Sequence, residues 1–184
     1  NLLLWSLVNE TLHVPYPDKT EQPITSVVFS PLQDDPRFIT SYKNGLFSLW
    51  SAEDQVAPPI ELPFEQGGRV YTMDFDGRNV LSGGYDGTIR EWNLETGQEN
   101  FHLKLEGEQI LFITYSPNHQ HILVGVKGSN NIYELSIKSN HLTRGVDIEN
   151  IIVYSGHEDY ILYMVYDEKM TTFFSVSQDS TLRQ

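Results

Sequence analysis

The sequence predicts an all-β fold built from a repeated, four-stranded antiparallel unit. Tryptophans recur 45 and then 42 residues apart, at Trp5, Trp50 and Trp92, and each closes a short run of alternating apolar residues. A period of about 40 to 50 residues is typical of repeat architectures. Tight-turn pairs precede two of these runs, Asn44-Gly45 and Asp86-Gly87, and such pairs between β-prone segments are strong hairpin signals. No segment carries the sustained 3.6-residue apolar period of an amphipathic helix.

The strands of each unit follow in the same order along the chain. First comes an apolar strand that ends near an aromatic residue, with copies at 24–30, 70–76, 110–116 and 161–167. A second strand leads into the tight turn, with copies at 37–42, 79–85, 121–127 and 172–178. The third strand runs to the Trp position, which Leu135 occupies in one unit. A weaker fourth strand is expected at 11–16, 60–64, 100–105 and 148–154.

These strands divide the chain into units. We expect the end of one unit at 1–16, whole units at 24–64, 70–105 and 110–154, and the start of another at 161–184. The aromatic residue near the end of each first strand recurs at one position and is predicted to pack in the core. The four copies are Phe29, Phe75, Tyr115 and Tyr166.

Composition limits the classes of function. The 184 residues are 39% hydrophobic, which is enough for a packed core, and contain no cysteine, which excludes disulfides, thiolate metal sites and a cysteine nucleophile. The sequence has 12 Lys and Arg and 25 Asp and Glu, so its formal charge is −13. This charge argues against binding to nucleic acid or to anionic membranes. The acidic excess predicts a preference for basic partner segments, with salt-sensitive association rates. No apolar run approaches the roughly 20 residues of a membrane span.

One stretch carries a specific resemblance. The run LSGGYDGTIREWN at residues 81–93 resembles a WD-repeat signature, and Gly156-His157 resembles the Gly-His element of that family. The resemblance extends over essentially the whole chain and implies a β-propeller, in which four-stranded blades surround a central channel. Such rings usually hold about seven blades of roughly 40–45 residues. We therefore expect an arc of a larger ring, about four blades' worth, which begins and ends within a third strand; a closed four-bladed ring is the alternative.

The resemblance also implies a structural His–Ser–Asp–Trp hydrogen-bond tetrad within blades. The unit at 70–105 has the Ser, Asp and Trp but lacks the His. In the last unit, at 161–184, the Trp would be residue 185. The unit at 24–64 holds a diluted version, with Thr and Asn in place of Ser and Asp. The unit that contains Leu135 has no tetrad. The matching residues are Ser82, Asp86 and Trp92 in the first, His157, Ser175 and Asp179 in the second, and Thr40, Asn44 and Trp50 in the diluted version.

Five side chains fall, by the same registration, on one rim of the propeller. Lys43 and Tyr85 immediately precede the turn, Arg69 and Tyr160 immediately precede the first strand, and Tyr71 lies one residue inside it. Tyr and Arg are the side chains that most often anchor protein interfaces. We predict a partner-binding rim here; ordinary solvated loops are the alternative.

The sequence gives little support to a catalytic or a metal-binding function. His119 and His121 could share one face, as a two-His metal site needs, but no third ligand is predictable. Asp74 to Gly77 lacks the spaced acidic ligands of a calcium loop. His157 precedes two acidic residues, yet the chain has no Gly-x-Ser-x-Gly element and no phosphate-binding loop. The glycosylation sequon at Asn9 is read as a chance match.

The sequence thus predicts a non-catalytic scaffold that presents loops to other proteins within a multiprotein assembly. We expect no cofactor and no metal, an intracellular and cytoplasmic location, and contacts with the remaining blades of the same protein. The alternative is a sensor or regulatory propeller attached to an effector enzyme, such as a nucleotide-dependent signalling protein or kinase, encoded outside these residues. A propeller hydrolase with its site in the channel has no support in the sequence.

Overall fold

The computed structural model describes residues 5–6, 11–12, 21–53, 58–105, 107–140, 145–167, 169 and 172–184. Within these residues every regular element is a β-strand and all pairing is antiparallel. The all-β fold class predicted from the sequence is therefore confirmed. The strands form three four-stranded sheets, one three-stranded sheet and one short hairpin.

Strands that follow one another in the chain are neighbours in each sheet. The hairpin pairs β1 (Trp5–Ser6) with β2 (Thr11–Leu12). The first sheet holds β3 (Ile24–Phe29), β4 (Arg37–Tyr42), β5 (Phe47–Ser51) and β6 (Ile60–Leu62). The second holds β7 (Val70–Phe75), β8 (Asn79–Gly84), β9 (Thr88–Asn93) and β10 (Glu99–Lys104). The third holds β11 (Ile110–Tyr115), β12 (His121–Val126), β13 (Ile132–Asn140) and β14 (Gly145–Tyr154), and the last holds β15 (Ile161–Tyr166), β16 (Phe173–Ser177) and β17 (Leu182–Arg183).

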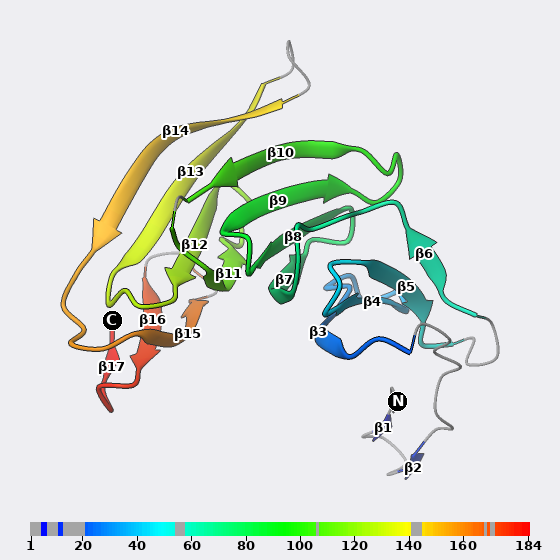
Figure 1. Cartoon of the computed structure of the whole chain (residues 1–184), viewed down its shortest axis with the longest axis horizontal. Coiled ribbons are helices and arrows are strands. Elements are labelled where there is room, and N and C mark those ends of the chain that lie inside the picture. Colours follow the sequence, from blue (N-terminus) through cyan, green and yellow to red (C-terminus); the bar gives the residue numbers. More distant parts are fainter. Residues whose placement is uncertain are drawn as a thin grey trace.

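The sheets fan out around a common inner side (Figure 1). The first strand of each sheet, β3, β7, β11 or β15, lies on that inner side, and the later strands lie progressively farther out. This is the arrangement of propeller blades along an arc. In each of these four sheets the start of the first strand pairs with the end of the second, so these two strand ends lie together near the inner side, at what we call the inner edge of the blade.

The core lies between neighbouring blades rather than within one sheet. Buried Val70, Met73 and Phe75 of β7 pack against buried residues of the first sheet, including Ile39 and Phe47. The same relation joins β11 to the second sheet and β15 to the third. Since each sheet buries a face on the next, the blades stabilise one another, as expected for a repeat architecture.

A β-bulge recurs near the start of each first strand. The pairing between first and second strands shifts at the second residue of the first strand. A bulge leaves one extra residue unpaired and re-aims its side chain. The extra residues are Thr25, Tyr71, Leu111 and Leu162.

Two glycines explain the predicted tight turns. Gly45 and Gly87 have φ values of +88° and +72°, a region that favours glycine. A Cβ at Gly45 would overlap the carbonyl oxygen of Gln66, and one at Gly87 would overlap that of Glu108. Each turn therefore lies directly against the loop that enters the next blade, which brings neighbouring blades together at this edge.

The predicted core aromatics do not share one environment. Phe75 and Tyr115 are buried, at 2% and 7% exposure, and Tyr166 is half-buried. The core prediction is wrong for Phe29, which is 50% exposed. Its ring contacts Phe38 of the same sheet at 5.0 Å between centroids. The equivalent rings are covered by the preceding blade, and in the described part of the chain no four-stranded sheet precedes β3.

Candidate functional site

A backbone hydrogen bond recurs at the inner edge of the four blades that begin with β3, β7, β11 and β15 in the described part of the chain. The residue that opens each tight turn donates its N–H to the carbonyl oxygen of the residue just before the first strand. The bonds are Lys43 to Pro23 at 2.9 Å, Tyr85 to Arg69 at 2.8 Å, Lys127 to Gln109 at 2.8 Å and Gln178 to Tyr160 at 3.0 Å. We call these eight residues, together with Tyr71, the inner rim.

The side chains of the rim form a connected row across the second and third blades. The Arg69 guanidinium carbon lies 5.3 Å from the centroid of the Tyr71 ring, a cation–π distance. The Tyr71 hydroxyl donates to Gln109 Oε1 at 3.4 Å, and Lys127 Nζ donates to the same oxygen at 3.5 Å. Tyr85, 58% exposed, stands beside Arg69. Large and cationic groups are thus gathered on one surface.

The five rim residues named from the sequence all lie at this edge. Lys43, Arg69 and Tyr85 are exposed, while Tyr71 and Tyr160 are half-buried. Sequence reasoning missed Gln109 and Lys127, although they hold the same positions in the third unit as Arg69 and Tyr85 in the second. The register of the repeat could have identified both residues, because Gln109 precedes a first strand as Arg69 does, and Lys127 precedes a turn as Lys43 and Tyr85 do.

A buried polar network ties the second blade together. Trp92 Nε1–H donates to Ser82 Oγ at 3.2 Å, and the Ser82 hydroxyl donates to Gln66 Oε1 at 2.9 Å. Gln66 Nε2 then donates to Asp86 Oδ1 and to the Thr88 carbonyl oxygen, both at 2.7 Å. Gln66, only 1% exposed, therefore stands where the tetrad lacks its histidine. The sequence pattern did not identify Gln66, because the family tetrad has a histidine at this place.

The last blade joins His157, Ser175 and Asp179. His157 Nδ1 lies 2.8 Å from Asp179 Oδ2, and Nε2 lies 2.9 Å from Ser175 Oγ. Because an ionised carboxylate only accepts, Nδ1 is the protonated nitrogen. Desolvation raises the pKa of Asp179, but hydrogen bonds from Thr181, the Glu158 N–H and His157 outweigh it, and the pKa is lowered below its ordinary value. The imidazole has a structural role here.

The first blade contains part of the predicted diluted tetrad of Thr40, Asn44 and Trp50. Trp50 Nε1–H donates to Thr40 Oγ1 at 2.8 Å, and the Thr40 hydroxyl donates to Tyr42 at 3.3 Å. Asn44 does not join them: its Oδ1 accepts the Leu46 N–H at 3.2 Å within its own turn. The expectation for Asn44 is corrected, because a turn asparagine can satisfy its side chain locally.

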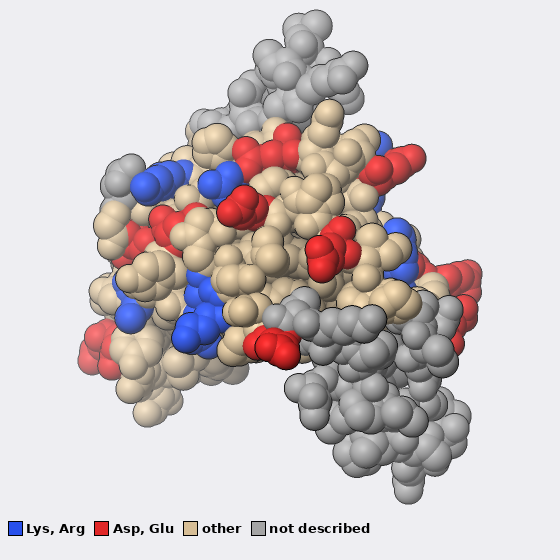
Figure 2. All heavy atoms as spheres, turned by 45° about the vertical axis from the view of Figure 1, so that its right-hand side comes forward, with Lys and Arg blue, Asp and Glu red and all other residues tan. Residues whose placement is uncertain are grey.

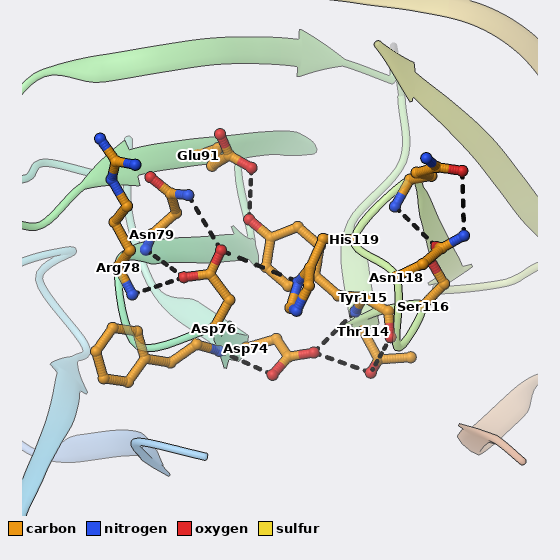
Figure 3. Close-up of polar contacts among 12 residues, drawn as sticks. Asp74, Asp76, Arg78, Asn79, Glu91, Thr114, Tyr115, Ser116, Asn118 and His119 are labelled. Atoms are coloured by element: carbon orange, nitrogen blue, oxygen red, sulfur yellow. Dashed lines mark hydrogen bonds and ion pairs between the residues drawn. The ribbon is translucent and has the colours of Figure 1, made fainter. Parts of the chain in front are cut away.

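A second polar cluster lies where the second blade meets the third (Figure 3). Asp74 Oδ2 accepts the Tyr115 N–H at 2.8 Å and the Thr114 hydroxyl at 2.9 Å, so a β7 carboxylate tethers β11. Glu91 on β9, 7% exposed, accepts the Tyr115 hydroxyl at 2.5 Å and Asn100 Nδ2 at 2.7 Å. Desolvation raises the pKa of Glu91, and burial likewise raises that of Tyr115.

The remaining chemical candidates are structural in this geometry. Asp76 caps its turn by accepting the Arg78 and Asn79 N–H groups, as Figure 3 shows. His119 lies 4.0 Å from Asp76, while His121 lies 3.1 Å from Glu134, so the two histidines face different carboxylates. Among the described residues, no three His, Cys, Asp or Glu side chains gather as a metal ion would need.

One cavity of about 560 Å³ lies between the third blade and the last. Its walls include Ile132, Tyr154 and Phe173, and the tetrad members His157 and Ser175. In the first and second blades, the oxygen equivalent to Ser175 Oγ accepts an indole N–H. The cavity thus lies against the tetrad of the last blade. No helix in the described part of the chain is long and apolar enough to cross a membrane.

Comparison with known proteins identifies the repeat. The family model "WD domain, G-beta repeat" (WD40) matches residues 62–93, which include β7, β8, β9 and Gln66. The chain carries a WD repeat. The WD repeat supports a protein-interaction scaffold as the general kind of function, and WD-repeat proteins are generally non-catalytic scaffolds.

A solved structure gives the same fold over most of the chain. The computationally designed Ika8 protein, a propeller-like design, matches with a TM-score of 0.64 and 19% identity. The match covers 86% of this chain and 44% of the designed chain. This WD-repeat chain thus spans less than half the length of that protein, and at this identity the likeness concerns the fold alone.

Proposed function

We propose that this WD-repeat chain is a non-catalytic scaffold that binds other proteins through its inner rim within a multiprotein assembly. The observation that carries the proposal is the connected row of Tyr85, Arg69, Tyr71, Gln109 and Lys127 on adjacent blades. Interfaces concentrate their binding energy in a few Tyr, Trp and Arg anchors. The rim offers such anchors side by side.

The rim is also held in place before any partner arrives. The backbone bonds between paired rim residues fix the turns against the blade entries. The Arg69 side chain lies over Tyr71, whose hydroxyl is bonded to Gln109. A preorganised surface loses less conformational entropy on binding, and therefore binds more tightly for the same contacts.

The test is a comparison of rim and control variants in the full-length protein. Partners are isolated with the wild-type protein and purified, and their dissociation constants are measured with Tyr85→Ala and Arg69→Ala. We expect each variant to bind at least about 10-fold more weakly, with stability within about 1 kcal/mol of wild type. Arg78→Ala, an exposed cation away from the rim, is the control. Unchanged affinity in both rim variants would exclude the rim as the interface.

A further inference from the structure

The inner rim has a charge opposite to that of the chain. The whole sequence carries a formal charge of −13, with about two acidic residues for each basic one. Yet none of the nine rim residues is Asp or Glu, and three are cations: Lys43, Arg69 and Lys127. On the face seen in Figure 2, acidic and basic side chains are interspersed. The nine rim residues therefore contribute three cations and three tyrosines, and no carboxylate.

The nearest turn carboxylates are occupied within their own blades. Asp86, directly after Tyr85, accepts hydrogen bonds from Gln66, Gly67 and Thr88. Asp179, directly after Gln178, accepts from His157, Glu158 and Thr181. These bonds hold both carboxylates in the blade networks, and neither carboxylate lies within 4.0 Å of a rim cation.

The rim cations themselves have no ionic partner among the described residues. Each ion pair of the described chain involves Arg37, Arg90 or a histidine. Glu65, Glu108 and Asp159 lie in the loops that lead to the first strands, and none of them is within 4.0 Å of a rim cation. Three cations on adjacent blades therefore have no carboxylate within 4.0 Å in the described residues and can pair with an anionic group of a partner.

We propose that the inner rim binds a short acidic peptide segment, with its carboxylates on Arg69, Lys127 and Lys43. An arginine fork can hold a carboxylate through two parallel hydrogen bonds, and the tyrosines beside it can pack against the intervening side chains. This inference rests on the proposed function and reverses, for the rim, the preference for basic partners that the composition predicts. Phosphate-rich nucleic acid is the competing anion, and the test below separates it.

The test measures fluorescence anisotropy of labelled probes with the full-length protein at 50 and 300 mM NaCl. The probes are an octapeptide of the pattern Glu-Glu-Leu-Glu-Glu-Leu-Glu-Glu, the same peptide with Lys in place of Glu, and an eight-nucleotide oligothymidylate. The variants are Arg69→Gln with Lys127→Gln, and the matched control Arg78→Gln with Lys104→Gln. The control removes two exposed cations that lie outside the rim.

We expect the acidic peptide to bind more tightly than both other probes, and more tightly at low salt. The rim double variant should weaken its binding at least about 10-fold, and the control double variant less than about twofold. Tighter binding of the lysine peptide or of oligothymidylate, or equal binding by the two double variants, would overturn the inference. If the rim variants lose the native partner while the acidic peptide does not bind, the scaffold function stands and the acidic class is wrong. If the rim variants keep the native partner, the proposed function fails instead.

Discussion

We predict that, among the polar residues of the second blade, Gln66 is the one whose replacement by alanine destabilises the protein most. Its side chain makes three hydrogen bonds: it accepts from Ser82 at 2.9 Å and donates to Asp86 and to the Thr88 carbonyl oxygen, each at 2.7 Å. In Gln66→Ala these three groups lose their partner. The site is buried, since Gln66 itself is only 1% exposed. The network that also holds the Trp92 indole is then broken at its centre.

The magnitude follows from the kinds of bond. A hydrogen bond to a charged group contributes about 1.5–3 kcal/mol and a neutral one about 0.5–1.5 kcal/mol. Of the three groups bonded to Gln66, the Asp86 carboxylate is charged and the other two are neutral. We therefore expect Gln66→Ala to lower the free energy of unfolding by about 3–5 kcal/mol. With an m-value of about 2 kcal/mol per M, the urea midpoint falls by about 1.5–2.5 M. The loss would be a large part of the roughly 5–15 kcal/mol that stabilises an ordinary domain.

Two further variants, made in the full-length protein, decide the reasoning. Gln66→His should stay within about 1 kcal/mol of wild type, because the last blade holds a histidine in the equivalent network at 2.8 and 2.9 Å. Gln98→Ala removes an exposed amide and should change stability by less than about 0.5 kcal/mol. If Gln66→Ala unfolds at the same urea concentration as Gln98→Ala, or if Gln66→His is as unstable as Gln66→Ala, Gln66 does not hold the tetrad together.

Desolvation raises the pKa of Glu91 above its ordinary value of 4.5, so its contribution to stability is present below that pH and is lost as the pH rises through the raised pKa. In urea titrations from pH 4 to 8, wild type should therefore lose stability relative to Glu91→Gln, and a constant difference would contradict this. Asp179 has a lowered pKa, so its contribution is present above 3.8 and is lost in acid; Asp179→Asn should be less stable than wild type at pH 7, and the difference should shrink below about pH 4. Gly87→Ala should cost about 1–3 kcal/mol more than Gly107→Ala, because both have positive φ but only the Gly87 Cβ meets a carbonyl oxygen; equal urea midpoints would refute the assigned overlap.

The repeat and its turns could be predicted because their signals are local. Trp50 and Trp92 recur at a fixed position of the third strand, and Asn44-Gly45 and Asp86-Gly87 have the turn chemistry that positive φ requires. The same register placed the five proposed rim residues at one edge, where the structure has them. The strand order of each blade follows from these signals, since consecutive antiparallel strands pair through short turns.

The sequence by itself therefore determined the four-stranded unit and five of the residues along its edge, but not Gln109 and Lys127. Only the tertiary structure decided which side chain completes each network. Gln66 reaches Ser82 and Asp86 from a loop 16 and 20 residues away, and an amide can replace an imidazole because both offer a donor and an acceptor. Glu91 is buried because Tyr115, from the next blade, covers it and donates a hydrogen bond. The unpaired charge of Arg69 and Lys127 likewise depends on which carboxylates fold back into their blades, which is set by contacts between segments and not by the pattern within one.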